Sequence, residues 1–176
     1  VGDMEPRASR RQVAEPTVRI GTFAALPAVL RSLGADPEKL LAEAGVDLER
    51  FDNPDNRISF SVRARMIAHC AARTACPHFG LLVGEQTGLN SLGFVGLLTR
   101  SSPDVQAALR SLERYWHFHA RGAVTTLAVE GNLATLRYEI YQPRTEAVDQ
   151  FGDGAVAVLF NIMRELCGRE WMPVEV

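Results

Sequence analysis

The chain has 176 residues, a length typical of one domain, and carries 19 basic and 21 acidic side chains for a formal net charge of −2. Hydrophobic residues make up 47% and charged residues 23% of the chain, proportions that exclude an intrinsically disordered protein. The near-neutral charge excludes the strongly basic surface that is typical of proteins that bind nucleic acids directly.

Targeting and cysteine patterns indicate a cytoplasmic protein. No stretch reaches the roughly 18 consecutive apolar residues that indicate a transmembrane helix. Residues 1–6 also lack the apolar core of a secretory signal. The cysteines are odd in number and form no CxxC pair, so we expect reduced thiols rather than disulfides.

The first residues differ in composition from the rest of the chain. Residues 1–16 are rich in arginine, glutamate and proline and contain few apolar side chains, so we expect a disordered leader. Residues 17–22 are expected to form a short strand or an extended entry. A single folded domain is then expected over residues 17–176.

Apolar residues at helical spacing predict two helices after this entry. The first runs from Leu26 to Leu33 and ends at Gly34, a residue typical of helix C-termini. The second begins at Asp36-Pro37-Glu38, where Asp caps free N–H groups and Pro occupies the first turn. It ends at Gly45.

A longer helix is expected between Ser59, its N-terminal cap, and Pro77. Three arginines, Arg63, Arg65 and Arg73, are expected to lie largely off its apolar face. The residues of that face are Val62, Met66, Ile67, Cys70 and Ala71.

Two short apolar helices are expected next, over residues 79–83 and 89–98. Several glycines lie in and between them, and none follows a clear strand with dinucleotide-binding spacing. We therefore expect close helix packing rather than phosphate binding at these positions. The glycines are Gly84, Gly88, Gly93 and Gly96.

The most regular helix is expected to begin at Ser102-Pro103-Asp104, a second combination of cap and proline. Trp116 and His119 share its inward face with Val105, Ala108, Leu109 and Leu112. His117, by contrast, is expected to interact with the helix dipole at the C-terminal end.

The period then changes from helical to alternating. Residues 124–130 and 133–141 predict a hairpin around the two-residue turn Gly131-Asn132. A last amphipathic helix is expected from Ala155 to Leu166, followed by another strand at residues 171–176. The fold class is therefore α+β, a mostly helical single domain with a small antiparallel sheet made of the 124–141 hairpin and the terminal strands.

Signatures of catalysis and of metal binding are missing from the sequence. It contains no HExxH, GxSxG or GxxxxGK[ST] pattern. His69 and Cys70, adjacent on one helix, point about 100° apart, so with Cys76 and His78 they are not expected to hold a metal. Asp149 and Asp153 are expected on the solvated start of a helix. We expect no catalytic residue, metal or cofactor.

An ordered series of segments resembles the N-terminal effector domain of AraC/XylS-type bacterial transcription regulators, in the branch with an arabinose-binding-type domain. The resemblance extends over roughly residues 20–176. Its segments are Leu40–Asp47, Pro54–Ile58, Pro77–Gly84, Leu92–Leu98, Ser101–Leu109 and Leu112–Tyr115.

The resemblance implies a domain that senses a small organic effector, forms a homodimer and modulates transcription through a C-terminal pair of helix-turn-helix units. No helix-turn-helix pattern occurs in this chain, so we expect no DNA-binding residue in it. DNA binding is expected only through units that follow Val176 in a longer parent protein, which the strand expected at the end of the chain favours; the alternative is a stand-alone relative of these regulators.

A ligand is expected between the sheet and the inward helix face. A site of this composition suits an apolar molecule with one polar end, such as a fatty or aromatic acid. Arg137 lies on the opposite strand face, so no buried cation is evident for a carboxylate. The candidate ligand-binding residues are Cys70, Trp116, His119, Leu136, Tyr138 and Phe160; the alternative for each is ordinary core.

Two other functions stay open. One is a dimerisation or interaction module without a ligand, which an exposed apolar face would support; the helix 155–166 and a strand edge are its candidate interfaces. The other is a small hydrolase or isomerase with His119 or His69 as its base, although no partner nucleophile or orienting carboxylate is visible. We expect that the chain is not an enzyme.

Overall fold

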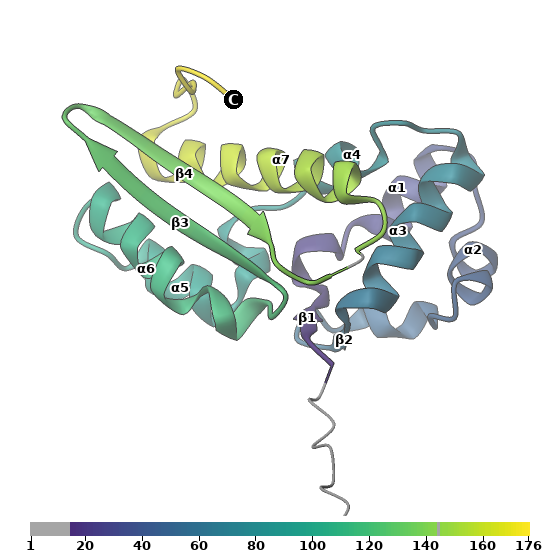
Figure 1. The fold of residues 1–176 in the computed structure, drawn as a ribbon. Coiled ribbons are helices and arrows are strands. Elements are labelled where there is room, and N and C mark those ends of the chain that lie inside the picture. Colours follow the sequence, from purple (N-terminus) through teal and green to yellow (C-terminus); the bar gives the residue numbers. More distant parts are fainter. Residues whose placement is uncertain (1–14, 144) are drawn as a thin grey trace, which may run out of the picture.

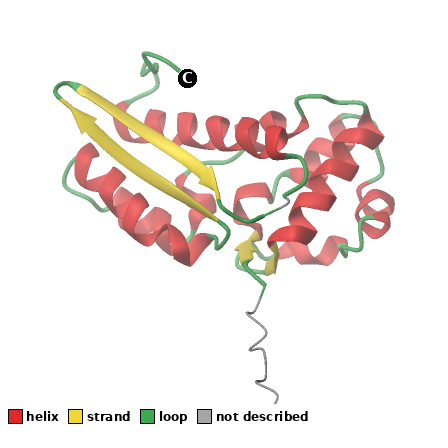
Figure 2. Cartoon of the chain, viewed as in Figure 1, coloured by secondary structure: helices red, strands yellow, loops and turns green. Residues whose placement is uncertain are grey.

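Two groups of elements lie on either side of the molecule, and the long helix α7 (Val148–Cys167) extends over both (Figure 1). The structure is a computed structural model that describes residues 15–143 and 145–176. Helices dominate, and the long hairpin is the main β-structure (Figure 2). The predicted α+β class is therefore confirmed.

The N-terminal group forms around a short antiparallel pair of strands in which Val18 lies opposite Ile58. Asp36 accepts hydrogen bonds from the N–H groups of Glu38 and Lys39, and Ser59 accepts one from Val62, so both predicted caps are confirmed. The elements are β1 (Thr17–Arg19), η1 (Ile20–Phe23), α1 (Leu26–Ser32), α2 (Pro37–Glu43), η2 (Leu48–Asp52), β2 (Arg57–Ser59) and α3 (Phe60–Thr74).

The second group packs a β-hairpin against two helices. The turn lies between Glu130 and Leu133, and Gly131 takes a φ of +61°, which a glycine adopts easily. Asp104, which accepts from the Ala107 N–H at 2.8 Å, is the cap of the longer helix. The elements are η3 (Leu89–Leu92), α5 (Phe94–Arg100), α6 (Val105–His119), β3 (Ala123–Glu130) and β4 (Leu133–Ile140).

The prediction of one continuous helix over residues 89–98 is wrong. The structure has two helices there, η3 and α5, which are separated at Gly93. This glycine has a φ of +58°. A Cβ at Gly96 would lie 1.8 Å from the carbonyl oxygen of Leu89. Close packing, as predicted for the glycines, is therefore confirmed at Gly96.

The prediction that the terminal segments extend the hairpin sheet is wrong. β1 pairs with β2 in a sheet of its own, and residues 171–176 form no strand. The hairpin packs against α6, and a hairpin that packs against a helix needs no further strands for its stability. On β3, α6 also occupies part of the edge: Arg110 donates to the Leu127 carbonyl at 3.1 Å, and Glu113 accepts from the Leu127 N–H at 3.0 Å.

The helix α4 (Phe79–Glu85) lies directly against α7 at glycines of both helices. A Cβ at Gly80 would lie 2.0 Å from the carbonyl oxygen of Gln150, and one at Gly84 would lie 2.5 Å from that of Gly154. The two backbones therefore touch, and the predicted close packing is confirmed at Gly84 as well.

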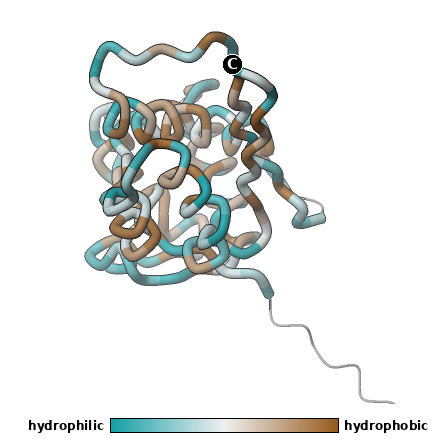
Figure 3. Tube along the Cα trace, turned by 90° about the vertical axis from the view of Figure 1, so that its left-hand side faces the viewer, coloured by the Kyte–Doolittle hydropathy of each residue, from teal (hydrophilic) through white to brown (hydrophobic). Residues whose placement is uncertain are grey.

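The remaining predictions from the sequence concern the leader and a membrane-spanning helix. Residues 1–14 of the predicted leader lie outside the described residues, whereas the Pro16 carbonyl accepts from the Phe60 N–H at 2.8 Å. Figure 3 shows hydrophobic and hydrophilic positions alternating along the elements. Within residues 15–143 and 145–176, no helix combines the length and apolarity needed to cross a membrane.

Candidate functional site

A small cavity lies where the two groups of elements meet beside α7. Its walls come from η1, α3 and α4 in the first part of the chain and from α6, β4 and α7 in the second. Its unfilled volume is about 40 Å³, room for very few water molecules and far below the several hundred cubic ångströms of an ordinary ligand pocket. In this conformation the cavity therefore has no room for a ligand of more than a few atoms.

Three of the sequence-predicted residues line this cavity together. The Trp116 and His119 rings, one turn apart on α6, have centroids 5.0 Å apart. The Tyr138 ring of β4 meets Trp116 edge-on at 5.9 Å. Helical spacing and strand alternation place these side chains inward, as the sequence indicated.

The other three predicted residues lie elsewhere. Cys70 is fully buried in the core beyond the cavity, and burial raises the pKa of its thiol to about 12. Leu136 packs against the core nearer the hairpin turn. Phe160 lies beside Trp171, with ring centroids 6.0 Å apart, because it follows Leu159 by one residue and so points to another side of α7.

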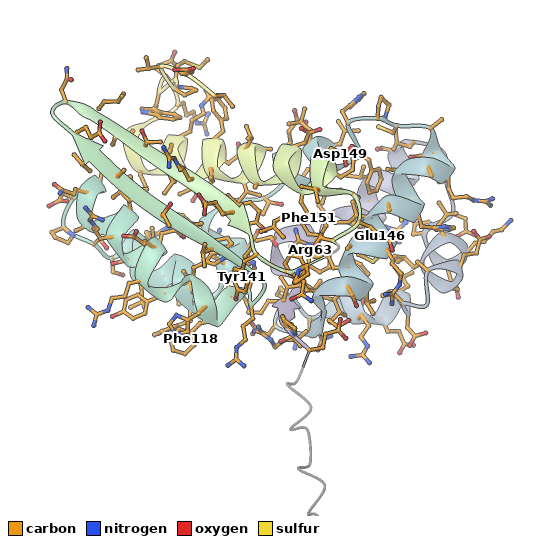
Figure 4. All side chains as sticks on the ribbon, viewed as in Figure 1. Arg63, Phe118, Tyr141, Glu146, Asp149 and Phe151 are labelled. Carbon is orange, nitrogen blue, oxygen red and sulfur yellow. The ribbon has the colours of Figure 1, made fainter. Side chains whose placement is uncertain are left out.

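The charged residue of the lining, Arg63, was missed from the sequence. Arg63 of α3 is half-buried, and its guanidinium lies 4.4 Å from the ring centroid of Phe151 and 4.9 Å from that of Phe23 (Figure 4). The prediction that Arg63 lies off the apolar face is wrong. A signal was present, since Arg63 precedes Ile67 and Cys70 by one and two helical turns on the same face.

Arg63 forms no ion pair with any carboxylate of the described residues, and its Nε is shielded from solvent without a hydrogen-bond partner there. Burial lowers the pKa of this guanidinium, an effect that the nearby Tyr138 phenol opposes. An arginine nevertheless stays protonated in proteins. The cavity therefore holds a permanent positive charge.

His119 lies fully buried at the same cavity. Burial lowers the pKa of its imidazole well below the ordinary value, and the positive charges of Arg63, Arg19 and Arg57 act in the same direction. Its Nε2 lies 3.3 Å from the Thr22 hydroxyl. His119 is consequently neutral near pH 7 and adds no second charge.

Buried polar atoms without partners gather at this site. Among the described residues, Trp116 Nε1, Arg63 Nε and His119 Nδ1 have no hydrogen-bond partner. A buried polar atom of this kind destabilises a fold by about 1–3 kcal/mol. Thr125 Oγ1, across the hairpin from Tyr138, is also without a partner but does not line the cavity.

Gln150 is a polar wall residue whose hydrogen-bonding groups are occupied by the protein. Its Oε1 accepts from the Gly80 N–H at 2.8 Å, and its Nε2 donates to the Pro77 carbonyl at 2.7 Å. It therefore fastens the start of α4 to α7. Nothing in the local sequence pattern marks this role.

The residues considered for a metal site do not converge. His69 Nε2 lies 3.0 Å from a carboxylate oxygen of Glu43 on α2, and Cys70 and Cys76 are buried. No three histidine, cysteine or acidic side chains come together within the part of the chain that the structure describes.

Comparison with known proteins identifies the family of this domain. A family model described as the N-terminal arabinose-binding domain of AraC transcription regulators matches residues 34–176. No curated protein matches the sequence significantly. The match confirms the resemblance seen in the sequence, and the chain belongs to the family of N-terminal, arabinose-binding-type domains of AraC transcription regulators.

Proposed function

We propose that this domain binds a small organic effector in the cavity beside α7 and thereby modulates transcription. The supporting observation is that unpartnered donors converge on a cavity at the junction of the two groups of elements. In this proposal DNA is bound by helix-turn-helix units in another part of a cytoplasmic parent protein.

The small volume of the cavity suggests how binding would act. An effector with more than a few atoms must widen the 40 Å³ space and so displace one wall. The α4–α7 wall is tightly packed, because the backbones of the two helices touch. Widening then moves α6 and the hairpin relative to α3. An effector that prefers this widened form shifts the population toward it, which is how a sensor changes the placement of attached units.

Thermal unfolding with a broad panel of small molecules tests this function. An effector at a hundred times its dissociation constant is expected to stabilise the domain by roughly 2.7 kcal/mol. Ala155→Leu, which fills the cavity, should abolish the shift, while Val156→Leu on the exposed side of α7 should preserve it. A shift that survives Ala155→Leu unchanged would move the effector site elsewhere.

A homodimer is the second part of the proposal, and exposed aromatic residues support it. Phe94 on α5 and Phe118 on α6 are 61% and 54% exposed, with ring centroids 6.3 Å apart, and Leu97 is 63% exposed. Phe118 points away from the body of the molecule (Figure 4). A contiguous apolar surface of this kind is typical of a protein contact.

The oligomeric state in solution tests this surface. The double variant Leu97→Ser/Phe118→Ser should be monomeric by light scattering, because it removes exposed apolar area and leaves the core intact. Val174→Ser, a change at a 92% exposed position in the tail, should leave a dimer intact. A dimer that persists in the double variant would exclude this face.

Catalysis is not part of the proposal. His119 has no carboxylate at its Nδ1 among the described residues, and the pKa of the Cys70 thiol, about 12, leaves it protonated. The Cys70 thiol is therefore not activated as a nucleophile near neutral pH. The lowered pKa of His119 makes its neutral imidazole a weak base, and no carboxylate of the described residues orients the ring.

A further inference from the structure

We propose that the cavity takes a monocarboxylate with an apolar body, and that Arg63 is the counter-ion of its carboxylate. The inference rests on the proposed effector site and narrows it to one chemical class. It has three independent supports: the charge of the cavity, the type of its unpartnered atoms and the chemistry of the remaining wall.

The charge of the cavity favours an anion. Arg63 is the only permanently charged side chain in the wall, which contains no aspartate or glutamate among the described residues. Two more arginines lie near His119 but are engaged: Arg19 pairs with Asp55, and Arg57 donates to the carbonyls of Phe118 and His119. Both arginines lower the pKa of His119, in the same direction as Arg63. A buried guanidinium without a carboxylate is unfavourable, and an anionic ligand would remove that penalty.

The unpartnered atoms require an acceptor. Arg63 Nε and Trp116 Nε1 can only donate hydrogen bonds. When the Thr22 hydroxyl donates to His119 Nε2, the ring proton lies on Nδ1, which then becomes a third donor. A carboxylate offers about four lone-pair positions on two oxygens, enough for these donors together.

The remaining wall selects the body of the ligand. It is largely apolar, with aliphatic and aromatic side chains from η1, α3, α4 and α7. Within the described part of the chain it has no carboxylate side chain that would pair with an ammonium group, so amines and zwitterionic amino acids are expected to bind weakly. A sugar such as arabinose would bury several hydroxyls against apolar side chains, which is also unfavourable. Apolar residues of this wall include Phe23, Ile67, Phe79, Val83, Val158 and Leu159.

Isothermal titration with compounds that share one carbon chain and differ in charge tests the inference directly. Hexanoate is expected to bind about tenfold or more tightly than hexanamide, because a charged hydrogen bond is stronger than a neutral one. Hexylamine and norleucine, which carry an ammonium group, should bind more weakly than hexanamide. Affinity should rise roughly fourfold per methylene from butyrate to hexanoate if the body is buried.

Two matched arginine variants separate the role of Arg63 from general charge. Arg63→Met should reduce hexanoate affinity to that of hexanamide and leave hexanamide binding unchanged. Arg65→Met removes an exposed arginine of the same helix and should change neither. Near-UV circular dichroism checks that each variant is folded. Arg63→Lys, which retains the charge, should keep a preference for hexanoate and serves if Arg63→Met does not fold.

The outcomes distinguish the ligand class from the effector site itself. Equal binding of hexanoate and hexanamide, or full hexanoate affinity in folded Arg63→Met, would overturn the carboxylate inference while the effector site stands. Binding of neutral compounds alone would have the same meaning. If none of these compounds binds at millimolar concentration, the carboxylate inference is again overturned, and the effector site then depends on the broader panel described above.

Discussion

The helix α7 makes two contacts of opposite character. Against α4 the two backbones touch at Gly80 and Gly84, and Gln150 satisfies the neighbouring backbone groups. Toward α3, α6 and β4 the same helix borders a cavity where Arg63 and Trp116 have unpartnered donors. Close packing and satisfied hydrogen bonds stabilise a fold, whereas buried donors without partners oppose it. The first contact is a structural wall, and the second has the features of a binding site.

The largest effect is expected where the cavity side also contributes to the core. Trp116→Ala should destabilise the domain by about 3–5 kcal/mol, because it removes a large buried side chain. Urea unfolding measures the loss. Trp116→Phe, which keeps one aromatic ring and removes the unpartnered N–H together with part of the indole, should lose less. A similar loss in both variants would show that the remaining ring does not retain the packing of Trp116.

The next largest loss of stability is expected for a substitution in the structural wall between α4 and α7. Gly80→Ala places a Cβ 2.0 Å from the Gln150 carbonyl oxygen and should destabilise by about 3 kcal/mol, since backbone must move. Gly152→Ala is the matched control on α7, where a Cβ meets nothing within 4 Å. That control should stabilise by about 0.5–1 kcal/mol through helix propensity. A neutral Gly80→Ala would show that α4 and α7 are not in tight contact.

A substitution at Gln150 tests whether its two side-chain hydrogen bonds stabilise the contact between α4 and α7. Gln150→Met should destabilise by about 2 kcal/mol, because the Gly80 N–H and the Pro77 carbonyl lose their partner. Effector binding per folded molecule should change little, since neither end of the Gln150 amide is free for a ligand. A strong loss of binding at full stability would instead place Gln150 among the ligand-binding residues.

The smallest effect is expected in the pH dependence of stability, which depends on the buried His119 on the cavity side of α7. Because the folded state lowers the pKa of His119, the unfolded chain binds the proton more readily. Stability should therefore be full above the unfolded pKa, about 6.5, and fall by up to about 1.4 kcal/mol per pH unit below it. His119→Gln should flatten this dependence, whereas His117→Gln, at an exposed site, should not. An unchanged slope in His119→Gln would assign the effect to other groups.

Local patterns identified much of the fold before any tertiary contact was known. Asp36 and Ser59 cap the helices that they were expected to cap, and Gly131 forms the hairpin turn. Each of these depends on a few neighbouring residues, so a short window contains the necessary information. The same reasoning aligned Trp116 with His119 on one face of a helix.

Where the structure differs from what local patterns indicated, the outcome depended on distant partners. Residues 171–176 have a strand-like pattern, yet the Trp171 N–H donates to the Gly168 carbonyl at 3.1 Å and its ring lies beside Phe160. Phe160 and Cys70 are apolar residues on predicted faces, but which part of a face borders a cavity depends on what packs against it.

The sequence by itself determined the family, the α+β class, the hairpin and the inward positions of Trp116, His119 and Tyr138, because these follow from residue order and local period. Only the tertiary structure decided that Arg63 enters the same cavity, between Phe23 and Phe151. Its aromatic neighbours come from η1 and α7, at opposite ends of the chain. The charge of a buried site depends on which long side chains its walls admit, and that is settled by packing.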